Sequence, residues 1–276
     1  MRALLLGVCV AALSGICVAD TDYTEVFYQS GDLRIQAYLY KPEGAGPFPA
    51  VIYNHGSREG RERKSLPWPH IGKLLRGAGY VVLVPERRGY GASDGPVDTS
   101  RGAAVVPRLQ AETDDVLAAA DYLRTLAFVD RGRLGITGHS YGGIVTMLAL
   151  ARSQGFAAAV DMAGGAQSWK GNAAVRAALT DAAEKSTTPT LFLVAENDAT
   201  TASITSLAEV YQRRGIAQRR VIYPAFIPEN RNAATGAGHQ IFSAQGVEFW
   251  KNDVLEFLDR YLKAPSRPAP APASKQ

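Results

Sequence analysis

The sequence predicts an α/β fold, with a mostly parallel central sheet and helices on both faces. Three observations lead to this prediction. Two strand-like segments joined by a tight turn come first. Short apolar segments then alternate with segments of helical spacing over most of the 276 residues. The apolar and charged fractions, 46% and 20%, are ordinary for a globular protein. A single domain of this length can bury most of its apolar surface without disulfides.

The first two predicted strands, 24–30 and 33–40, alternate apolar and polar residues around Gly31-Asp32, a pattern typical of a hairpin. Further strands are predicted where short apolar runs lie between turn signals, at 49–53, 80–84, 133–137, 157–161, 190–195 and 219–223. Helices are predicted at 70–78, 109–126, 141–151, 202–214 and 246–262. Strands that alternate with helices run parallel, so a ligand should bind at the carboxyl ends of the strands.

Residues 1–19 have the composition of a secretory signal peptide cleaved after Ala19. A positive start is followed by a short apolar run and then by small residues. A buried first helix, a membrane anchor and a lipid on Cys17 are the alternatives. The apolar run is too short to span a bilayer comfortably, and Ile16 stands where a lipoprotein signal needs a small residue. We expect an exported protein, periplasmic or secreted, without stable membrane insertion.

The rest of the chain is predicted to form one folded domain, 20–263, and a flexible tail rich in proline and alanine, 264–276. Both cysteines, Cys9 and Cys17, lie in the predicted signal peptide. The mature chain would therefore contain no disulfide, no thiolate metal site and no cysteine nucleophile.

Composition and motifs exclude several classes of partner. Without Arg2 the chain has 29 basic and 26 acidic residues, which is a mild imbalance. Basic residues cluster over 58–64, but glutamates are interleaved with them, which favours a solvated loop over a nucleic-acid site. The chain has no metal-ligand spacing, phosphate-binding loop or dinucleotide fingerprint, so we expect no metal and no cofactor. The sequence does not indicate the oligomeric state.

The pattern G-x-S-x-G, typical of a strained turn that carries a serine nucleophile, occurs around Ser93 and around Ser140. Such a turn needs a strand before it and a helix after it. Only Ser140 has both, because Pro96 and a polar loop follow Ser93. We therefore predict that Ser140 is the nucleophile and Ser93 a loop residue. A plain helix cap would explain a serine at 140, but not the flanking glycines.

A serine nucleophile needs a base and an acid that orients the base. His239 is the candidate base, because it alone among the four histidines lies between the last predicted strand and the last helix. Two carboxylates, Glu196 and Asp198, follow the strand at 190–195. We favour Asp198, because its turn can direct a carboxylate across the sheet edge. Asp161 is a remote third candidate.

Acyl transfer also needs backbone donors for the developing oxyanion. We predict the N–H groups of Tyr141, next to the nucleophile, and of Ser57, in the loop that follows the strand at 49–53. The candidate substrate pocket is lined by His55, Trp68 and Trp169, the last two meeting across the site. The segment 164–189 and the loop 57–69 are the places where a lid would form.

Taken together, the motifs resemble the α/β-hydrolase superfamily, in its dienelactone-hydrolase-like and S9-peptidase-like branches. The matching motifs, in chain order, are His55-Gly56, the turn 85–91, Gly138-His139-Ser140-Tyr141-Gly142, Glu196-Asn197-Asp198 and Gly238-His239. The resemblance covers about 23–262 and implies the α/β-hydrolase fold. In such families Arg88 and its neighbouring glycines are structural.

Two departures from those branches indicate a stand-alone esterase. Dienelactone hydrolases proper use a cysteine where this chain has Ser140. S9 peptidases carry a large amino-terminal propeller, for which we see no room in this sequence. The expected activity is hydrolysis of small, soluble carboxylic esters. A peptidase or amidase of the S9-like type, and a non-catalytic binding protein on the same scaffold, are the alternatives.

Overall fold

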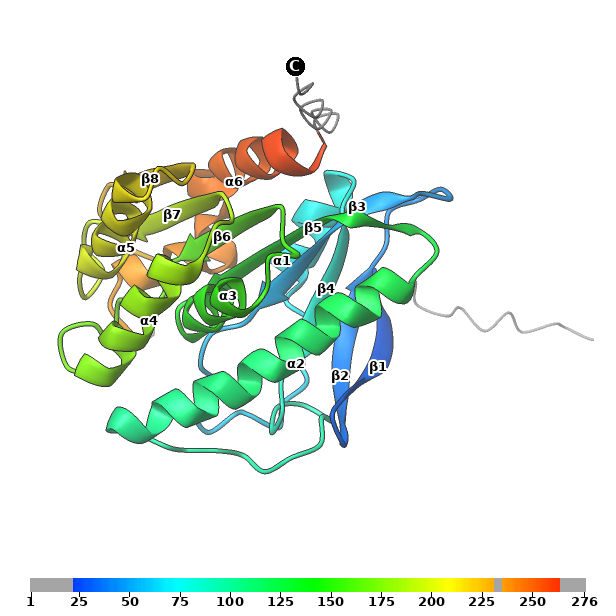
Figure 1. Ribbon diagram of the computed structural model, residues 1–276, viewed down its shortest axis with the longest axis horizontal. Coiled ribbons are helices and arrows are strands. Elements are labelled where there is room, and N and C mark those ends of the chain that lie inside the picture. Colours follow the sequence, from blue (N-terminus) through cyan, green and yellow to red (C-terminus); the bar gives the residue numbers. More distant parts are fainter. Residues whose placement is uncertain (1–21, 231–234, 264–276) are drawn as a thin grey trace, which may run out of the picture.

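The protein is described here by a computed structural model that covers residues 22–230 and 235–263. An eight-stranded sheet forms its centre, in the order β1-β2-β4-β3-β5-β6-β7-β8 (Figure 1). Strand β2 runs antiparallel to both of its neighbours, and the remaining pairs are parallel. The strands are β1 (Thr24–Ser30), β2 (Leu33–Tyr40), β3 (Phe48–Asn54), β4 (Val81–Glu86), β5 (Val129–His139), β6 (Ala158–Met162), β7 (Thr190–Ala195) and β8 (Gln218–Tyr223).

Helices cover both faces of this sheet, as predicted. Helices α2 (Val105–Thr125), α3 (Tyr141–Arg152), α4 (Ala173–Lys185) and α5 (Ala202–Arg213) follow one another along one face. Helices α1 (Pro69–Gly77) and α6 (Val247–Leu262) contact each other on the opposite face. Right-handed crossovers explain the place of α1, because the connection from β3 through α1 to β4 runs along the sheet in the opposite direction to the later parallel connections. The predicted α/β class and mostly parallel sheet are confirmed.

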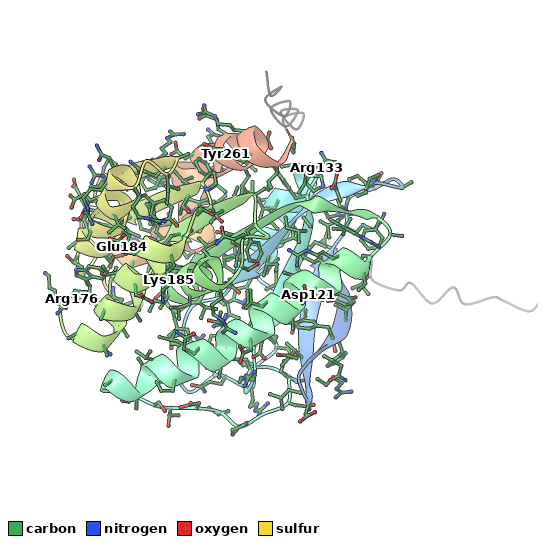
Figure 2. The ribbon with its side chains drawn as sticks, viewed as in Figure 1. Asp121, Arg133, Arg176, Glu184, Lys185 and Tyr261 are labelled. Atoms are coloured by element: carbon green, nitrogen blue, oxygen red, sulfur yellow. The ribbon has the colours of Figure 1, made fainter. Side chains whose placement is uncertain are left out.

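One helix was not predicted. Helix α4 lies within the segment 164–189 that the sequence offered as a lid. Its inner side buries Val175, Leu179, Ala182 and Ala183. Charged residues such as Lys185 lie on its outer surface, as does Asp121 on α2 (Figure 2).

The basic segment 58–64 is not uniformly solvated, which corrects the prediction. Arg58 is 2% exposed, and its guanidinium forms an ion pair with the buried carboxylate of Glu86 on β4. It also donates to the carbonyl oxygen of Lys64 at 2.8 Å. Arg58 therefore fastens its loop to the sheet.

The sheet brings four functional segments to one edge. Strands β3, β5 and β7 run parallel, and each ends at the point where a predicted site loop begins: after Asn54, His139 and Ala195 respectively. The short 3-10 helix Gly238–Phe242, labelled η2, contacts β7 from the chain beyond β8.

Candidate active site

Ser140 lies at a sharp turn between β5 and α3. Its backbone has φ 59° and ψ −117°, a conformation that strains any residue with a Cβ. The flanking glycines are required by close backbone contacts. A Cβ on Gly138 would lie 2.2 Å from the carbonyl oxygen of Gly142, and one on Gly142 would lie 1.9 Å from that of Asn54. The turn can therefore form only with this glycine pair.

The side chains of Ser140, His239 and Asp198 form one continuous hydrogen-bonded chain. His239 Nε2 lies 2.7 Å from Ser140 Oγ, and His239 Nδ1 lies 2.7 Å from Asp198 Oδ2. Because a carboxylate only accepts, the proton is assigned to Nδ1, which leaves Nε2 free to accept the serine proton. His239 is 3% exposed, and the carboxylate of Asp198 is wholly buried.

The turn after β7 holds Asp198 in place. The Asp198 backbone N–H donates to the carbonyl oxygen of Ala195 at 3.1 Å. Carboxylate oxygen Oδ1 accepts the Ala199 N–H at 2.6 Å and the side-chain amide of Gln167 at 2.9 Å. Gln167 was not foreseen from the sequence, because a single glutamine in a turn belongs to no motif.

The other two carboxylates considered from the sequence do not join this chain. Glu196 is exposed, and its Oε1 accepts the backbone N–H of Ala225 at 3.0 Å. Asp161 is fully buried behind the serine turn, where its Oδ1 accepts the Gly164 N–H at 2.8 Å. Burial raises the pKa of Asp161 to about 7.

His139 lies behind the base. Its ring centroid is 4.7 Å from that of His239, and its Nε2 donates to the His239 carbonyl oxygen at 3.2 Å. Burial holds the pKa of His139 well below its ordinary value, so the ring is neutral. The His139 ring therefore packs against the residue that supplies the base.

The predicted oxyanion donors come from two different segments, the start of α3 and the loop after β3. Tyr141 is the first residue of α3, where a backbone N–H has no partner within the helix. Ser57 is exposed in the loop after β3, and this loop approaches the serine closely: a Cβ on Gly56 would lie 3.4 Å from Ser140 Cβ. The buried side chain of Arg87 holds this loop by donating a hydrogen bond to the carbonyl oxygen of His55 at 3.0 Å.

Ion pairs to two buried carboxylates of α2, Glu112 and Asp115, hold the arginines near the site loops. Arg87 Nε donates to Glu112 Oε2 at 2.7 Å, and Arg108 Nε donates to Glu112 Oε1 at 2.8 Å. Arg88 pairs with Asp115 at 2.8 Å, in keeping with its expected structural role. Neither Glu112 nor Asp115 was recognised as a support of the site, because on the predicted helix both read as ordinary charged residues.

Two of the three predicted pocket residues, His55 and Trp169, are buried. His55 is fully buried and stacks on Trp68, with the ring planes 4° apart. Burial and the nearby Arg87 keep the pKa of His55 well below its ordinary value. Trp169 is 7% exposed and packs in the core, and the aromatic partners of Trp68 are Tyr53, His55 and His70. Of the three predicted pocket residues, only the half-buried Trp68 retains exposed surface beyond its edge of the core.

Two hollows flank Tyr141 instead. The first, of about 160 Å³, is charged and reaches Ser57; its other lining residues include Glu59, Glu62, Asp98, Arg101 and Arg108. The second, of about 240 Å³, is more apolar and is lined by Val105, Leu109, Ile144 and Val175, with Ser168 and Asn172 from the turn before α4. Tyr141, which follows the serine directly in the chain, lines both hollows.

The second G-x-S-x-G copy has a structural role, as predicted for a loop residue. Ser93 is 2% exposed, donates to the Glu86 carbonyl oxygen and accepts the Gln36 N–H at 2.9 Å.

Within the described ranges, no helix is long and apolar enough to cross a membrane. The same residues contain no group of three or more histidine, cysteine, aspartate or glutamate side chains placed to hold a metal ion.

The eight-stranded mixed sheet, with a strained serine at a strand-to-helix turn, defines the class: the chain is a serine hydrolase of the α/β-hydrolase superfamily. The model of the X-Pro dipeptidyl-peptidase (S15) family matches residues 30–248, and the chain belongs to this family.

Relatives of known structure or name include both peptidases and an esterase. The acylaminoacyl peptidase of Pyrococcus horikoshii superposes with a TM-score of 0.67 at 21% identity, over 90% of this chain and 42% of that one. Est1E from Butyrivibrio proteoclasticus, solved with ferulic acid bound, superposes with a TM-score of 0.64 at 20% identity, over 86% of this chain and 99% of that one. At these identities the likeness shows the fold.

A third relative is matched by sequence. The quorum-quenching protein AidA of Acinetobacter baumannii is 28% identical over 123 residues, which are 43% of this chain and 36% of that protein. The alignment thus spans little more than a third of this relative, and the acylaminoacyl peptidase is likewise less than half covered.

Proposed function

We propose that the protein hydrolyses small carboxylic esters through an acyl-enzyme on Ser140. The observation that carries this proposal is the unbroken hydrogen-bonded chain from Ser140 Oγ through His239 to Asp198, with 2.7 Å at each step. In such a chain, removal of the serine proton creates an imidazolium that the buried carboxylate stabilises.

The proposed reaction has two halves. In the first, His239 Nε2 takes the proton of Ser140 as Oγ attacks the ester carbonyl, and then gives it to the departing alcohol. In the second, a water molecule loses a proton to His239 and attacks the acyl group, which releases the acid and restores the serine. The N–H groups of Ser57 and Tyr141 stabilise the oxyanion in both halves.

The hollows beside Tyr141 support a preference for short acyl groups. The apolar hollow of about 240 Å³ is smaller than the roughly 300–1,000 Å³ of typical ligand pockets, and its wall includes Val105, Leu109 and Ile144. An alkyl or aryl group of a small ester would enter this hollow. The fold-level likeness to Est1E, which spans 99% of that esterase, agrees with this proposal.

Cleavage of an amide or peptide bond is the second candidate function. The family description names X-Pro dipeptidyl-peptidases, and an acylaminoacyl peptidase shares the fold. The charged hollow next to Ser57 adds a specific observation, because Glu59, Glu62 and Asp98 line it together. Arg101 and Arg108 line the same hollow, and Arg101 pairs with Glu59, so three carboxylates stand against two guanidinium groups. The remaining negative charge would favour a substrate with a free ammonium group.

Serine variants test the proposed nucleophile. We expect Ser140→Ala to lower kcat on p-nitrophenyl acetate by about 10⁴-fold or more, because the residue acts as one unit with its base. Ser93→Ala is the matched control: it should retain activity, although it loses two buried hydrogen bonds. A folded Ser140→Ala variant with normal turnover would contradict the assignment. Failure of the wild-type serine to react with a fluorophosphonate would favour a binding protein without catalysis.

A substrate panel separates the two candidate functions. We expect kcat/KM to peak at acetyl to butyryl in a series of p-nitrophenyl esters and to be lower on aminoacyl and X-Pro p-nitroanilides. Each methylene contributes only about 1 kcal/mol in such a pocket, so the peak should be broad. A maximum on long acyl chains would refute the short-acyl preference, and a maximum on an X-Pro anilide would establish the peptidase.

A further inference from the structure

Gln167 occupies a junction between three segments of the site. It lies in the turn between β6 and α4, and its Nε2 donates to Asp198 Oδ1 at 2.9 Å. A Cβ on Gly236, three residues before the base, would lie 4.0 Å from the same nitrogen. The amide thus contacts the acid turn and faces the loop that carries His239.

We propose that Gln167 is a positioning residue of this active site, holding the carboxylate of Asp198 so that Oδ2 faces His239. The inference rests on the proposed function, since it assigns a residue to the same reaction. Gln167 does not touch the reacting atoms and acts through Asp198.

The surroundings of Asp198 explain why a positioning group is needed. A carboxylate can rotate about its last bond, and only one of its oxygens can face Nδ1 of His239. Oδ1 receives two N–H donors, from the Ala199 backbone at 2.6 Å and from Gln167 at 2.9 Å. In residues 22–230 and 235–263 no lysine or arginine lies within ion-pair distance of Asp198. The two amide donors therefore fix the rotation.

The turn that carries Gln167 is itself well defined. The Trp169 N–H donates to the Gly165 carbonyl oxygen at 2.8 Å, and Asn172 N–H donates to that of Ser168 at 2.8 Å. Ser168 and Asn172 line the apolar hollow beside Tyr141. A substrate group in that hollow would contact the turn that orients the acid, which links substrate binding to the geometry of the base.

Two variants test this role. Gln167→Ala removes the donor, and we expect kcat on p-nitrophenyl acetate to fall about 10-fold, as for loss of a hydrogen bond to a charged group, with KM changed less than about 2-fold. Gln167→Glu keeps the shape of the side chain but places a second negative charge beside Asp198. It should lower kcat further and move the acid limb of the kcat/KM profile to higher pH, because the added charge stabilises protonated His239.

Controls separate this role from a general effect on folding. Gln110→Ala, at an exposed glutamine of α2, should leave kcat and the pH profile unchanged. Thermal melting of each variant reports folding, and the isosteric Gln167→Glu keeps the comparison valid if the alanine variant unfolds. Wild-type kcat and an unmoved pH profile in both Gln167 variants would overturn the proposal. Ser140→Ala, run in parallel, tests the function itself: if it is inactive while Gln167→Ala is normal, only the positioning role fails.

Discussion

Replacing Asp198 by asparagine should stop proton transfer at His239 while leaving the fold intact. The reason lies in how the carboxylate is held. Oδ1 already receives two donors, from Ala199 and Gln167, so the asparagine oxygen will occupy that position. Its NH₂ group is then turned toward His239 Nδ1, where Oδ2 now lies at 2.7 Å.

The imidazole must respond by accepting at Nδ1 and carrying its proton on Nε2. That proton points at Ser140 Oγ, so the histidine becomes a donor to the serine and cannot act as its base. A wrong tautomer of this kind lowers kcat by about 10⁴-fold, which corresponds to about 5.5 kcal/mol in the activation free energy.

The assay is kcat on p-nitrophenyl acetate for Asp198→Asn beside the matched variant Glu196→Gln. Glu196 is exposed, and its Oε1 accepts the Ala225 N–H at 3.0 Å, an interaction that a glutamine oxygen preserves. We expect the control to stay within about 2-fold of wild type, as is usual for surface substitutions. If Glu196→Gln is the crippled variant and Asp198→Asn is active, Glu196 is the acid and the tautomer argument is wrong.

Three further predictions concern stability and processing. Burial raises the pKa of Asp161 from 3.8 to about 7, so the folded state retains a proton that the unfolded chain has lost. The free energy of unfolding of the wild type should therefore fall by on the order of 4 kcal/mol between about pH 4 and pH 7, relative to Asp161→Asn; parallel urea-denaturation profiles for the two proteins would refute this. Gly142→Ala should abolish activity and lower the melting temperature, because its Cβ would lie 1.9 Å from the Asn54 carbonyl oxygen, whereas Gly171→Ala, with nothing within 4 Å, should do neither. Intact mass of the protein from its native host should correspond to a chain beginning at Asp20, and a mass that includes residues 1–19 or a lipid on Cys17 would exclude the predicted export signal.

Most of the fold was predictable because its elements have strong local patterns. The strands at 24–30, 33–40 and 190–195 occur within the predicted bounds, since alternation or an apolar run marks each of them. Helix α4 was missed although its buried residues, Val175, Leu179, Ala182 and Ala183, have helical spacing. Alanines such as Ala173 and Ala177 also occupy its exposed side, so the apolar stripe does not stand out from the rest of the segment.

The candidate site was predictable where a residue type is rare and its place in the chain order is informative. Four histidines left one candidate for the base, and the strand–turn–helix context selected Ser140 over Ser93. The supporting residues carried no such signal. Gln167 and Glu112 reach the site only through tertiary packing, and the stack of His55 on Trp68 shows that nearness in sequence to a site loop does not place a ring in the pocket.

The three side chains of the proposed relay are far apart along the chain: 99 residues separate Ser140 from His239, and 41 separate Asp198 from His239. During synthesis, the serine turn can form well before its base has left the ribosome. The nascent chain should therefore remain without hydrolase activity until η2, which carries His239, has docked against β7. Return of that activity after denaturation would then mark closure of the carboxy-terminal third of the sheet, later than any signal from β1–β5 alone.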